Sequence, residues 1–293
     1  MPPIASVVIP AHDEEAVVGR CLDALLTGAD PSELDIVVAC NGCTDRTAEV
    51  AETYHGVRVL SIEPASKIAA LNAGDRAARA YPRIYLDADA ELTGEDARAL
   101  AVALTDGDCL AAAPRRTMVL DDRSVAVRLY YRFSQRLPVF EEGFIGSGAY
   151  ALSERGRARW GAWPDVVADD LLVLRSFDPH ERRTVWDARV VVHPPKRFRQ
   201  LLRRGVRVVR ANRELGRVAS PRLPAPPSGF RVAAAAALCD PRRWPDLVVF
   251  VSAQLLMRLG AAITSDGVRW NQDRSARAPA GRVARPERGA RAR

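Results

Sequence analysis

Short apolar runs alternate with segments of helical periodicity over residues 1–113. The β-branched runs predict strands at 5–9, 35–39, 57–62, 83–86 and 109–113. The segments between them predict helices at 14–26, 44–54, 66–80 and 94–104, the third with Ser66 as its N-cap. Pro10 is expected to end the first strand, because proline cannot donate to a strand ladder. The alternation predicts an α/β fold with a mostly parallel central sheet flanked by helices.

This alternation is lost beyond residue 120. The pattern there predicts helices at 124–137 and from 169, a glycine-hinged segment at 144–152, and a strand at 184–192. A basic helix at 198–214 and an apolar helix at 244–263 follow, on either side of a linker with four prolines at 221–227. We expect one domain over 1–215 in two parts (1–113 and 114–215), a C-terminal helical extension over 216–270 and a disordered basic tail over 271–293.

Composition is that of a globular protein, with 48% hydrophobic and 27% charged residues among 293. The five cysteines are irregularly spaced, which does not suggest a disulfide framework. The first residues lack the pattern of a signal peptide. The longest apolar run, 247–257, is interrupted by Ser252 and Gln254 and falls short of the roughly 20 residues of a membrane span. We therefore expect no spanning helix and a cytoplasmic location, with a peripheral position at the inner membrane face as an alternative.

The net charge of +7 is concentrated in two segments, 196–217 and 271–293. Because Phe198 is the one aromatic residue among these arginines, we expect no nucleic-acid partner. The tail has two interpretations, a solvated end or a contact with an anionic surface. The predicted basic helix presents one face of arginines, suited to diphosphates or to an anionic bilayer: Arg199, Arg203, Arg207 and Arg210. The helix at 244–263 is more typical of a core helix than of an interfacial one.

Two carboxylates, Asp87 and Asp89, directly follow the predicted strand at 83–86. In α/β sheets ligands bind at the carboxyl ends of the strands, and paired carboxylates there suit Mg²⁺ or Mn²⁺ shared with substrate phosphates. A second Asp-x-Asp pair, Asp106 and Asp108, precedes its strand and is typical of a turn. Position therefore favours Asp87 and Asp89 as the metal ligands, with a structural turn as the alternative.

Segments 10–15, 40–45 and 66–67 are predicted at the same edge of the sheet. Helix N-termini, an Asn-Gly turn and Lys67 suit an anionic, nucleotide-like ligand, although Lys67 would also fit an ordinary surface position. The Cys40-x-x-Cys43 pair is a weak candidate for zinc or redox chemistry, because no second pair exists and His12 lacks ligand spacing.

Four segments, VVIPAHDEE, IVVACNGCTDRT, SKIAALNAG and IYLDADAEL, occur in an order and spacing that resemble family-2-type inverting glycosyltransferases with the GT-A (Rossmann-like) fold. The resemblance is strong over residues 4–113. It continues more loosely through IGSGAYALSERGRARW and PDVVADDLLVL to about residue 215. It implies that residues 1–113 bind a nucleoside-diphosphate sugar and that residues 114–215 bind a hydroxyl acceptor.

The resemblance also implies roles for individual residues. Asp87 and Asp89 would hold the divalent cation on the donor diphosphate, near Lys67. Asp170 of the Asp169-Asp170 pair would be the catalytic base, the alternative being that the pair only caps a helix. The remaining substrate-binding positions are Pro10, Ala11, Glu14 and Asn41 for the nucleoside, and Gln200 and Arg203 for the diphosphate or acceptor.

The chain departs from the family pattern at three points, the mildest being His12-Asp13 in place of the usual Tyr-Asn before Glu14. The usual Asp-Asp after the second strand is Cys40-Asn41, so the carboxylate contact to a uracil ring is missing at Cys40. The Gln-x-x-Arg-Trp motif keeps Gln200 and Arg203 but has Arg204 in place of Trp, which argues against a processive synthase. Two other function classes stay open: a sugar-nucleotide nucleotidyltransferase, disfavoured because PAHDEE lacks glycine, and a non-catalytic protein that binds nucleic acid or an anionic surface.

Overall fold

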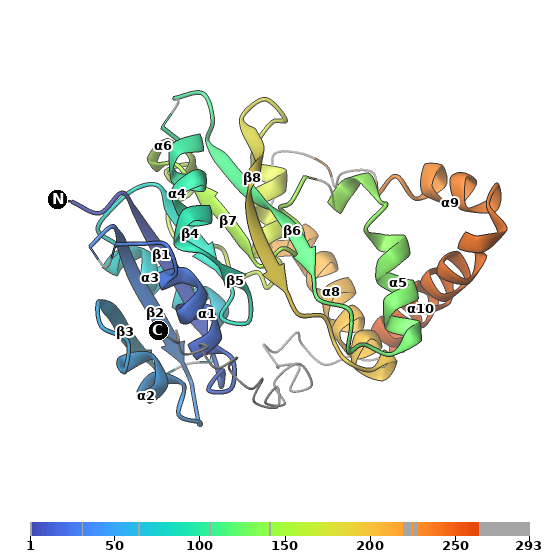
Figure 1. Ribbon diagram of the computed structural model, residues 1–293, viewed down its shortest axis with the longest axis horizontal. Coiled ribbons are helices and arrows are strands. Elements are labelled where there is room, and N and C mark those ends of the chain that lie inside the picture. The colour runs from blue at the N-terminus through green and yellow to red at the C-terminus, as the bar shows by residue number, and fades with distance from the viewer. Residues whose placement is uncertain are drawn as a thin grey trace, which may run out of the picture.

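An eight-stranded mixed sheet, in the order β3-β2-β1-β4-β7-β6-β8-β5, is covered by helices (Figure 1). The computed structural model describes residues 2–263 except positions 31, 64, 106, 141, 219–223 and 225–227. The predicted tail at 271–293 and most of the predicted linker at 221–227 lie outside the described residues.

The strands are β1 (Ala5–Ala11), β2 (Leu34–Asn41), β3 (Val57–Ile62), β4 (Arg83–Leu86), β5 (Glu91–Leu92), β6 (Ala111–Met118), β7 (Ala149–Leu152) and β8 (Arg182–Val192). The helices are α1 (Val18–Leu26), α2 (Thr47–Glu52), α3 (Lys67–Ala77), α4 (Gly94–Ala103), α5 (Val125–Ser134), α6 (Glu154–Arg157), α7 (Asp169–Ser176), α8 (Phe198–Val218), α9 (Phe230–Leu238) and α10 (Trp244–Ile263). The sequence did not predict β5, α6 or α9, which are short or built mainly of alanine.

The first four predicted strands pair in parallel with one another, as expected. Every residue of β1 and β2 is buried, which explains their nearly continuous apolar sequences. The prediction that Pro10 ends the first strand is wrong, because β1 continues to Ala11 and pairs there with Cys40. β4 pairs with β1 only as far as Val8, so Pro10 lies where one neighbouring strand has already ended.

The strand predicted at 109–113 is not the next strand of the parallel array. It begins β6, and β7 lies between β4 and β6, antiparallel to both. β7 comes from the glycine-hinged segment predicted at 144–152, and its residue Ala149 pairs with Leu86 at the end of β4. The insertion of β7 brings the second half of the chain beside the segment that carries Asp87 and Asp89.

The C-terminal helices pack on the second half of the chain, at the end of the molecule away from β1–β3 (Figure 1). Ala253 and Met257 of α10 are buried with Val127 of α5 and Leu201 of α8. A Cβ atom on Gly205 would lie 2.2 Å from the sulfur of Met257, so glycine allows α8 and α10 to approach closely here. The predicted extension is thus joined to the preceding residues by a common apolar cluster.

One described stretch, Pro241–Ile263, has the length and mean hydropathy (1.6) of a membrane-spanning helix. Only 28% of its apolar window is buried. The sequence prediction considered only the uninterrupted apolar run and expected no such helix. Length and composition alone do not distinguish a membrane-spanning helix from a core helix. The distinction depends on which residues of this stretch are packed against the rest of the protein.

Candidate active site

A cavity of about 640 Å³ opens at the carboxyl ends of β1 and β4. Its acidic lining residues come from the segments after β1 and β4 and from the start of α7: Glu14, Asp87, Asp89, Asp169 and Asp170. Its arginines come from β6, α8 and α10: Arg116, Arg204, Arg207 and Arg258. The cavity is therefore lined by both halves of the chain and by the C-terminal helices.

Lys67 joins the two halves inside this cavity. Its ammonium group lies 3.0 Å from Oδ1 of Asp87 and 2.8 Å from Oδ1 of Asp169. Ser66 caps α3 by accepting a hydrogen bond from the backbone N–H of Ala69, which sets the direction of the helix that begins with Lys67. Burial opposes the charge of Lys67, but the attraction of Asp169 and Asp87 outweighs it and raises the pKa of the lysine. Lys67 is therefore not a surface lysine.

Asp169 is buried, and both of its carboxylate oxygens are engaged. Oδ1 accepts from Lys67, and Oδ2 accepts a hydrogen bond of 2.9 Å from the hydroxyl of Tyr150 on β7. The helix α7 begins at Asp169 itself, and its N-cap residue Ala168 makes no side-chain cap bond. The alternative that Asp169 is a helix cap is therefore wrong; this carboxylate instead balances the charge of Lys67.

Asp170 differs from its neighbour in being partly exposed to the cavity. Its carboxylate accepts hydrogen bonds from the backbone N–H groups of Gly146, at 3.0 Å, and Leu171, at 2.7 Å. Burial, followed by the adjacent negative charge of Asp169, raises the pKa of Asp170 to about 6. A carboxylate with this pKa is ionised at neutral pH and is a stronger base than an ordinary aspartate, which suits proton abstraction.

Asp87 and Asp89 both line the cavity, in the turn between β4 and β5. The backbone N–H of Asp87 donates to the carbonyl of Gly148 (2.7 Å), which fixes the turn against β7. The side chain of Asp87 already holds one cationic group, Lys67, whereas that of Asp89 has no hydrogen-bond or ion-pair partner within the described residues. Two carboxylates open to one cavity fit Mg²⁺ or Mn²⁺, which take oxygen ligands and retain positions for substrate phosphates.

Of the four positions expected to bind the nucleoside, Pro10 and Glu14 line the cavity, whereas Ala11 and Asn41 are fully buried beside it. The side-chain amide of Asn41 is unusual because neither its oxygen nor its nitrogen has a hydrogen-bond partner among the described residues. A buried polar group left unpaired costs about 1–3 kcal/mol. At the end of β2, the side-chain NH₂ and C=O groups of Asn41 are therefore both free to bind a partner that these residues do not supply.

The loops after β1 and β2 are tied together by polar contacts. The carboxylate of Asp13 accepts from the backbone N–H of Thr44 (2.6 Å), and Nδ1 of His12 lies 2.7 Å from the carbonyl oxygen of Asn41. Asp13 has a φ of 49°, in the left-handed region. These bonds hold the two loops in a fixed relationship next to Pro10.

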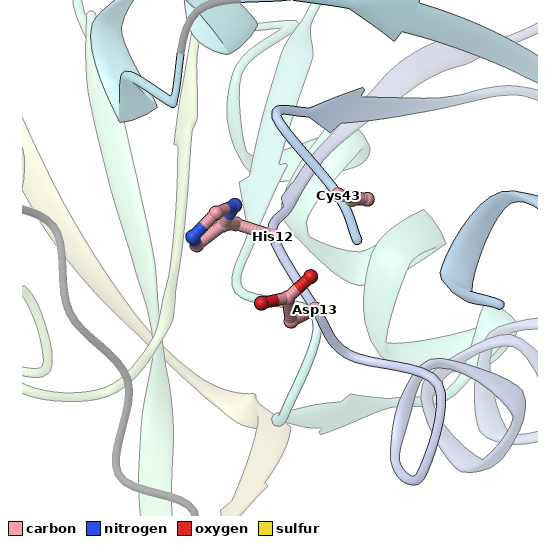
Figure 2. A group of neighbouring side chains, drawn as sticks. All are labelled: His12, Asp13 and Cys43. Carbon is pink, nitrogen blue, oxygen red and sulfur yellow. The ribbon is translucent and has the colours of Figure 1, made fainter. Parts of the chain in front are cut away.

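His12, Asp13 and Cys43 form a cluster whose potential ligand atoms lie within 4.8 Å of one another (Figure 2). Sequence spacing missed it because His12 and Cys43 lie on different loops, which parallel pairing of β1 with β2 brings together. Hydrogen bonds from the Cys40 thiol and from the backbone of Asp13 lower the pKa of Cys43 against the effect of burial. The cluster is thus also a place where a cysteine has thiolate character.

The two downstream motif residues do not line the cavity. Gln200 accepts a hydrogen bond of 2.8 Å from the backbone N–H of Arg197 at the start of α8, and Arg203 is exposed. Arg204 and Arg207 line the cavity instead, Arg204 occupying the position of the missing Trp. Each step along a helix rotates the side chain by about 100°, so α8 turns Arg204, not Arg203, toward the site.

Sequence reasoning missed Tyr150 and Arg116. The guanidinium of Arg116 lies 4.7 Å from the ring centre of Phe140 and donates to the carbonyl oxygen of Ile145 at 3.4 Å. Burial lowers the pKa of Arg116 to about 10. No motif marks either residue; both reach the site because β7 pairs with β4 and β6 pairs with the other side of β7. The nearby Trp163 is buried and its indole N–H donates to Asp75, so it belongs to the core.

Comparison with known proteins agrees with this geometry. Residues 6–156, about half of the chain, match the family model "Glycosyl transferase family 2". A stretch of 93 residues is 30% identical to the uncharacterized glycosyltransferase EpsJ of Bacillus subtilis (strain 168); it covers 30% of this chain and 27% of that protein. The chain thus spans only about a quarter of that curated relative.

Three solved structures share the fold at lower identity. The mannosyltransferase PcManGT from Pyrobaculum calidifontis, in complex with GDP-Man and Mn²⁺, has a TM-score of 0.55 at 22% identity, over 90% of this chain and 77% of its own. Glucosyl-3-phosphoglycerate synthase of Mycobacterium tuberculosis, in complex with Mn²⁺, UDP and glucosyl-3-phosphoglycerate, has a TM-score of 0.53 at 20% identity, over 74% and 80%. TarS of S. aureus with UDP-GlcNAc has a TM-score of 0.51 at 15% identity, over 66% and 59%.

These similarities confirm the expected GT-A-like α/β fold with additional C-terminal helices. The family match favours a glycosyltransferase over the two alternatives that the sequence left open, a nucleotidyltransferase and a non-catalytic binding protein. The chain belongs to glycosyltransferase family 2.

Proposed function

We propose that this glycosyltransferase transfers a sugar from a nucleotide-sugar donor to an acceptor hydroxyl with inversion of the anomeric configuration. Asp170 would be the base, and Asp87 and Asp89 would bind Mg²⁺ or Mn²⁺. The observation that supports this most directly is the double ion pair of Lys67, at 3.0 Å from Asp87 and 2.8 Å from Asp169. It joins the predicted donor residues to the predicted base in one cavity, although Lys67 and Asp169 are 102 residues apart.

The donor would lie with its diphosphate beside Asp87, Asp89 and Lys67. A divalent cation there supplies positive charge against the charge that develops on the departing diphosphate. Lys67 adds an ammonium group at the same place. Because two carboxylates already orient this group, it would need to move little as negative charge develops on the diphosphate. The structures of PcManGT and of the M. tuberculosis synthase, which contain Mn²⁺ together with GDP-Man or UDP, support a metal of this kind.

Asp170 would accept the proton of the acceptor hydroxyl. The hydroxyl oxygen forms a bond to the anomeric carbon while the bond from that carbon to the diphosphate oxygen breaks, and the proton passes to the Asp170 carboxylate. A single displacement of this kind inverts the anomeric configuration. The backbone N–H of Gly146 holds one carboxylate oxygen at 3.0 Å and keeps the group directed along the cavity wall.

The donor nucleotide depends on the loops after β1 and β2. Cys40 lacks the carboxylate that would contact uracil, and the related structures contain both guanosine and uridine donors. The unpaired, buried amide of Asn41 offers one donor and one acceptor group. We infer that donor binding rearranges this edge so that Asn41 finds a partner on the nucleoside or in the adjacent loop, near Pro10 and Glu14.

The acceptor would enter from the arginine-lined part of the cavity. Arg116, Arg204 and Arg207 line the wall formed by β6 and α8, and no carboxylate from these two elements lines it within the described residues. An acceptor with a negatively charged group fits this lining best. Gln200 and Arg203 remain predictions for diphosphate or acceptor contacts, which would require a change at the start of α8.

A nucleotide screen tests this function. Melting temperatures are measured with GDP, UDP and dTDP, each with and without Mn²⁺, and the sugar donors of the best nucleotide are then tested for release of the diphosphate. We expect one nucleotide to stabilise the protein selectively and only with the metal, because a ligand of the native state raises its stability. Stabilisation that is equal with and without Mn²⁺ would contradict the proposed metal role.

A further inference from the structure

The outward face of α10 is apolar apart from Ser252, which is exposed between Val248 and Leu255. Trp244, Val248, Leu255 and Leu259 are each more than half exposed, and they recur at helical spacing. The opposite face of the same helix, with Phe250 and Met257, is buried against α5 and α8. A surface helix of a globular protein normally carries polar residues on its outer side. In α10 the outer side is apolar as well, although it is not buried against the rest of the described residues.

The neighbouring helix α9 extends this surface. It packs against α10 at the same end of the molecule (Figure 1) and exposes further large side chains. We define the α9–α10 apolar face by six residues that are 51–72% exposed: Val232, Leu238, Trp244, Val248, Leu255 and Leu259. On α10 this face runs from Trp244 to Leu259, which corresponds to about 24 Å of helix. Ordinary protein surfaces expose large apolar residues singly and not in a continuous face of this length.

Positive charge surrounds the α9–α10 apolar face. Arg231, Arg242 and Arg258 are exposed beside it. The nearby acidic residues are paired with arginines: Asp240, between α9 and α10, lies 2.9 Å from Arg243, and the buried Asp246 is paired with Arg132 of α5 and with Arg136 just after that helix. By composition, residues 264–293 continue this charge with eight arginines against three acidic residues, and they contain few large apolar residues that would suit this face.

We propose that the α9–α10 apolar face docks on an anionic lipid bilayer, with the two helices lying in the plane of the membrane interface. Apolar side chains would enter the boundary of the acyl chains, and the arginines would contact anionic head groups. Two copies joined through the same face would instead bring their arginine rims together, which like-charge repulsion opposes. The charge around the face therefore favours lipid over a second copy.

The packing of α10 also favours docking over spanning. A spanning α10 would have to leave the cluster that buries Ala253 and Met257 with α5 and α8. It would also have to carry Asp246 away from Arg132 and Arg136, at 3.2 Å and 3.3 Å. A charged residue within the hydrocarbon layer is costly. Met257 and Arg258 also line the site cavity, so a docked α10 would form both the membrane contact and part of the cavity wall.

Vesicle sedimentation with the full chain tests this proposal. The protein is mixed with phosphatidylglycerol vesicles or with phosphatidylcholine vesicles, at low salt and at about 0.5 M salt, where charges are screened beyond a few ångströms. We expect the protein to sediment with the anionic vesicles and binding to weaken as salt rises. The variant Val248→Asp/Leu255→Asp should bind at least about tenfold more weakly, because charge is expelled from the interface.

Val102→Asp on α4 is the matched control, since Val102 and Val248 are each 61% exposed. It should bind vesicles like the wild type. Melting temperatures of all variants report their folding, and Arg242→Gln/Arg243→Gln, which keeps the apolar face, should reduce the salt dependence. Equal binding by the control and the α10 variant would overturn the proposal. The proposal would also be overturned if the wild type were a dimer and the α10 variant were monomeric but still bound vesicles, because the face would then be a dimer interface. Release from the vesicles by detergent but not by salt would overturn it too, because it would indicate a spanning helix.

Discussion

The ammonium group of Lys67 lies 2.8 Å from Oδ1 of Asp169, with 5% of the aspartate side chain exposed. The pair connects the first turn of α3, in the N-terminal half of the chain, to the first turn of α7, which follows β7. Removing the lysine would leave a buried carboxylate that retains only the hydroxyl of Tyr150 as a partner among the described residues.

We predict that Lys67→Met lowers the free energy of unfolding by roughly 3–5 kcal/mol, because it breaks a buried ion pair by removing one partner. Urea denaturation measures the loss. The other lysine of the chain, Lys196, serves as control, since it lies 3.6 Å from an exposed Asp122. Lys196→Met should cost at most about 1 kcal/mol. Similar losses of unfolding free energy in the two variants would show that Lys67 does not form a buried ion pair with Asp169.

Asp170→Asn should reduce turnover by about 10²–10⁴-fold, the usual contribution of a general base. The exposed Asp165, five residues earlier, gives a control variant, Asp165→Asn, which should keep its activity. Diphosphate release from the donor identified by the nucleotide screen measures both. Near-wild-type turnover of a correctly folded Asp170→Asn would remove Asp170 from the role of base.

The pH dependence provides an independent test of Asp170. Because burial raises its pKa to about 6, the base is protonated and inactive below that pH. We expect kcat/KM to fall about tenfold per pH unit below pH 6 and to be level just above it. A profile that remains level to pH 4.5 would contradict the assignment, because an ordinary aspartate titrates near pH 3.9.

Asp89→Ala should abolish the Mn²⁺-dependent part of nucleotide stabilisation, which is about 2.7 kcal/mol at a ligand concentration of a hundred times Kd. Asp108→Ala is the matched control, as Asp108 belongs to the other Asp-x-Asp pair and is exposed ahead of β6. Thermal denaturation with and without Mn²⁺ measures both variants. Asp89 would not be a metal ligand if its variant responded to the metal like the control.

The variant Asn41→Leu tests whether Asn41 acts in nucleotide binding or in the stability of the unliganded protein. Because the amide is buried without partners, an apolar side chain of similar size should leave the unliganded melting temperature unchanged or slightly higher. The rise in melting temperature on adding the nucleotide and Mn²⁺ should become smaller. A large loss of stability without any ligand would show instead that Asn41 has a structural role.

Cys43 should react with iodoacetamide at neutral pH faster than the more exposed Cys239, since its lowered pKa increases the thiolate fraction. Peptide mapping by mass spectrometry measures the two rates. Cys40→Ala removes the thiol that donates to the Cys43 sulfur and should slow the reaction at Cys43. If Cys40→Ala had no effect, the hydrogen bond between the two thiols would not be the cause.

Local sequence determined the elements and the donor edge of this protein. The predicted strands at 57–62 and 83–86 and the helix at 244–263 match β3, β4 and α10, because apolar periodicity is a property of neighbouring residues. The position of Asp87 and Asp89 after a strand was likewise sufficient to place them in the cavity, since parallel strands bring ligands to their carboxyl ends.

Tertiary structure decided everything that depends on which distant segments become neighbours. The insertion of β7 between β4 and β6 brought Tyr150 and Gly146 to the two aspartates of α7. The rotation of α8 selected Arg204 over Arg203, and the pairing of β1 with β2 assembled His12, Asp13 and Cys43. The apolar outer face of α10 became visible only once its inner face was packed. Periodicity shows that a helix has apolar residues, but only packing shows which of them remain without a partner.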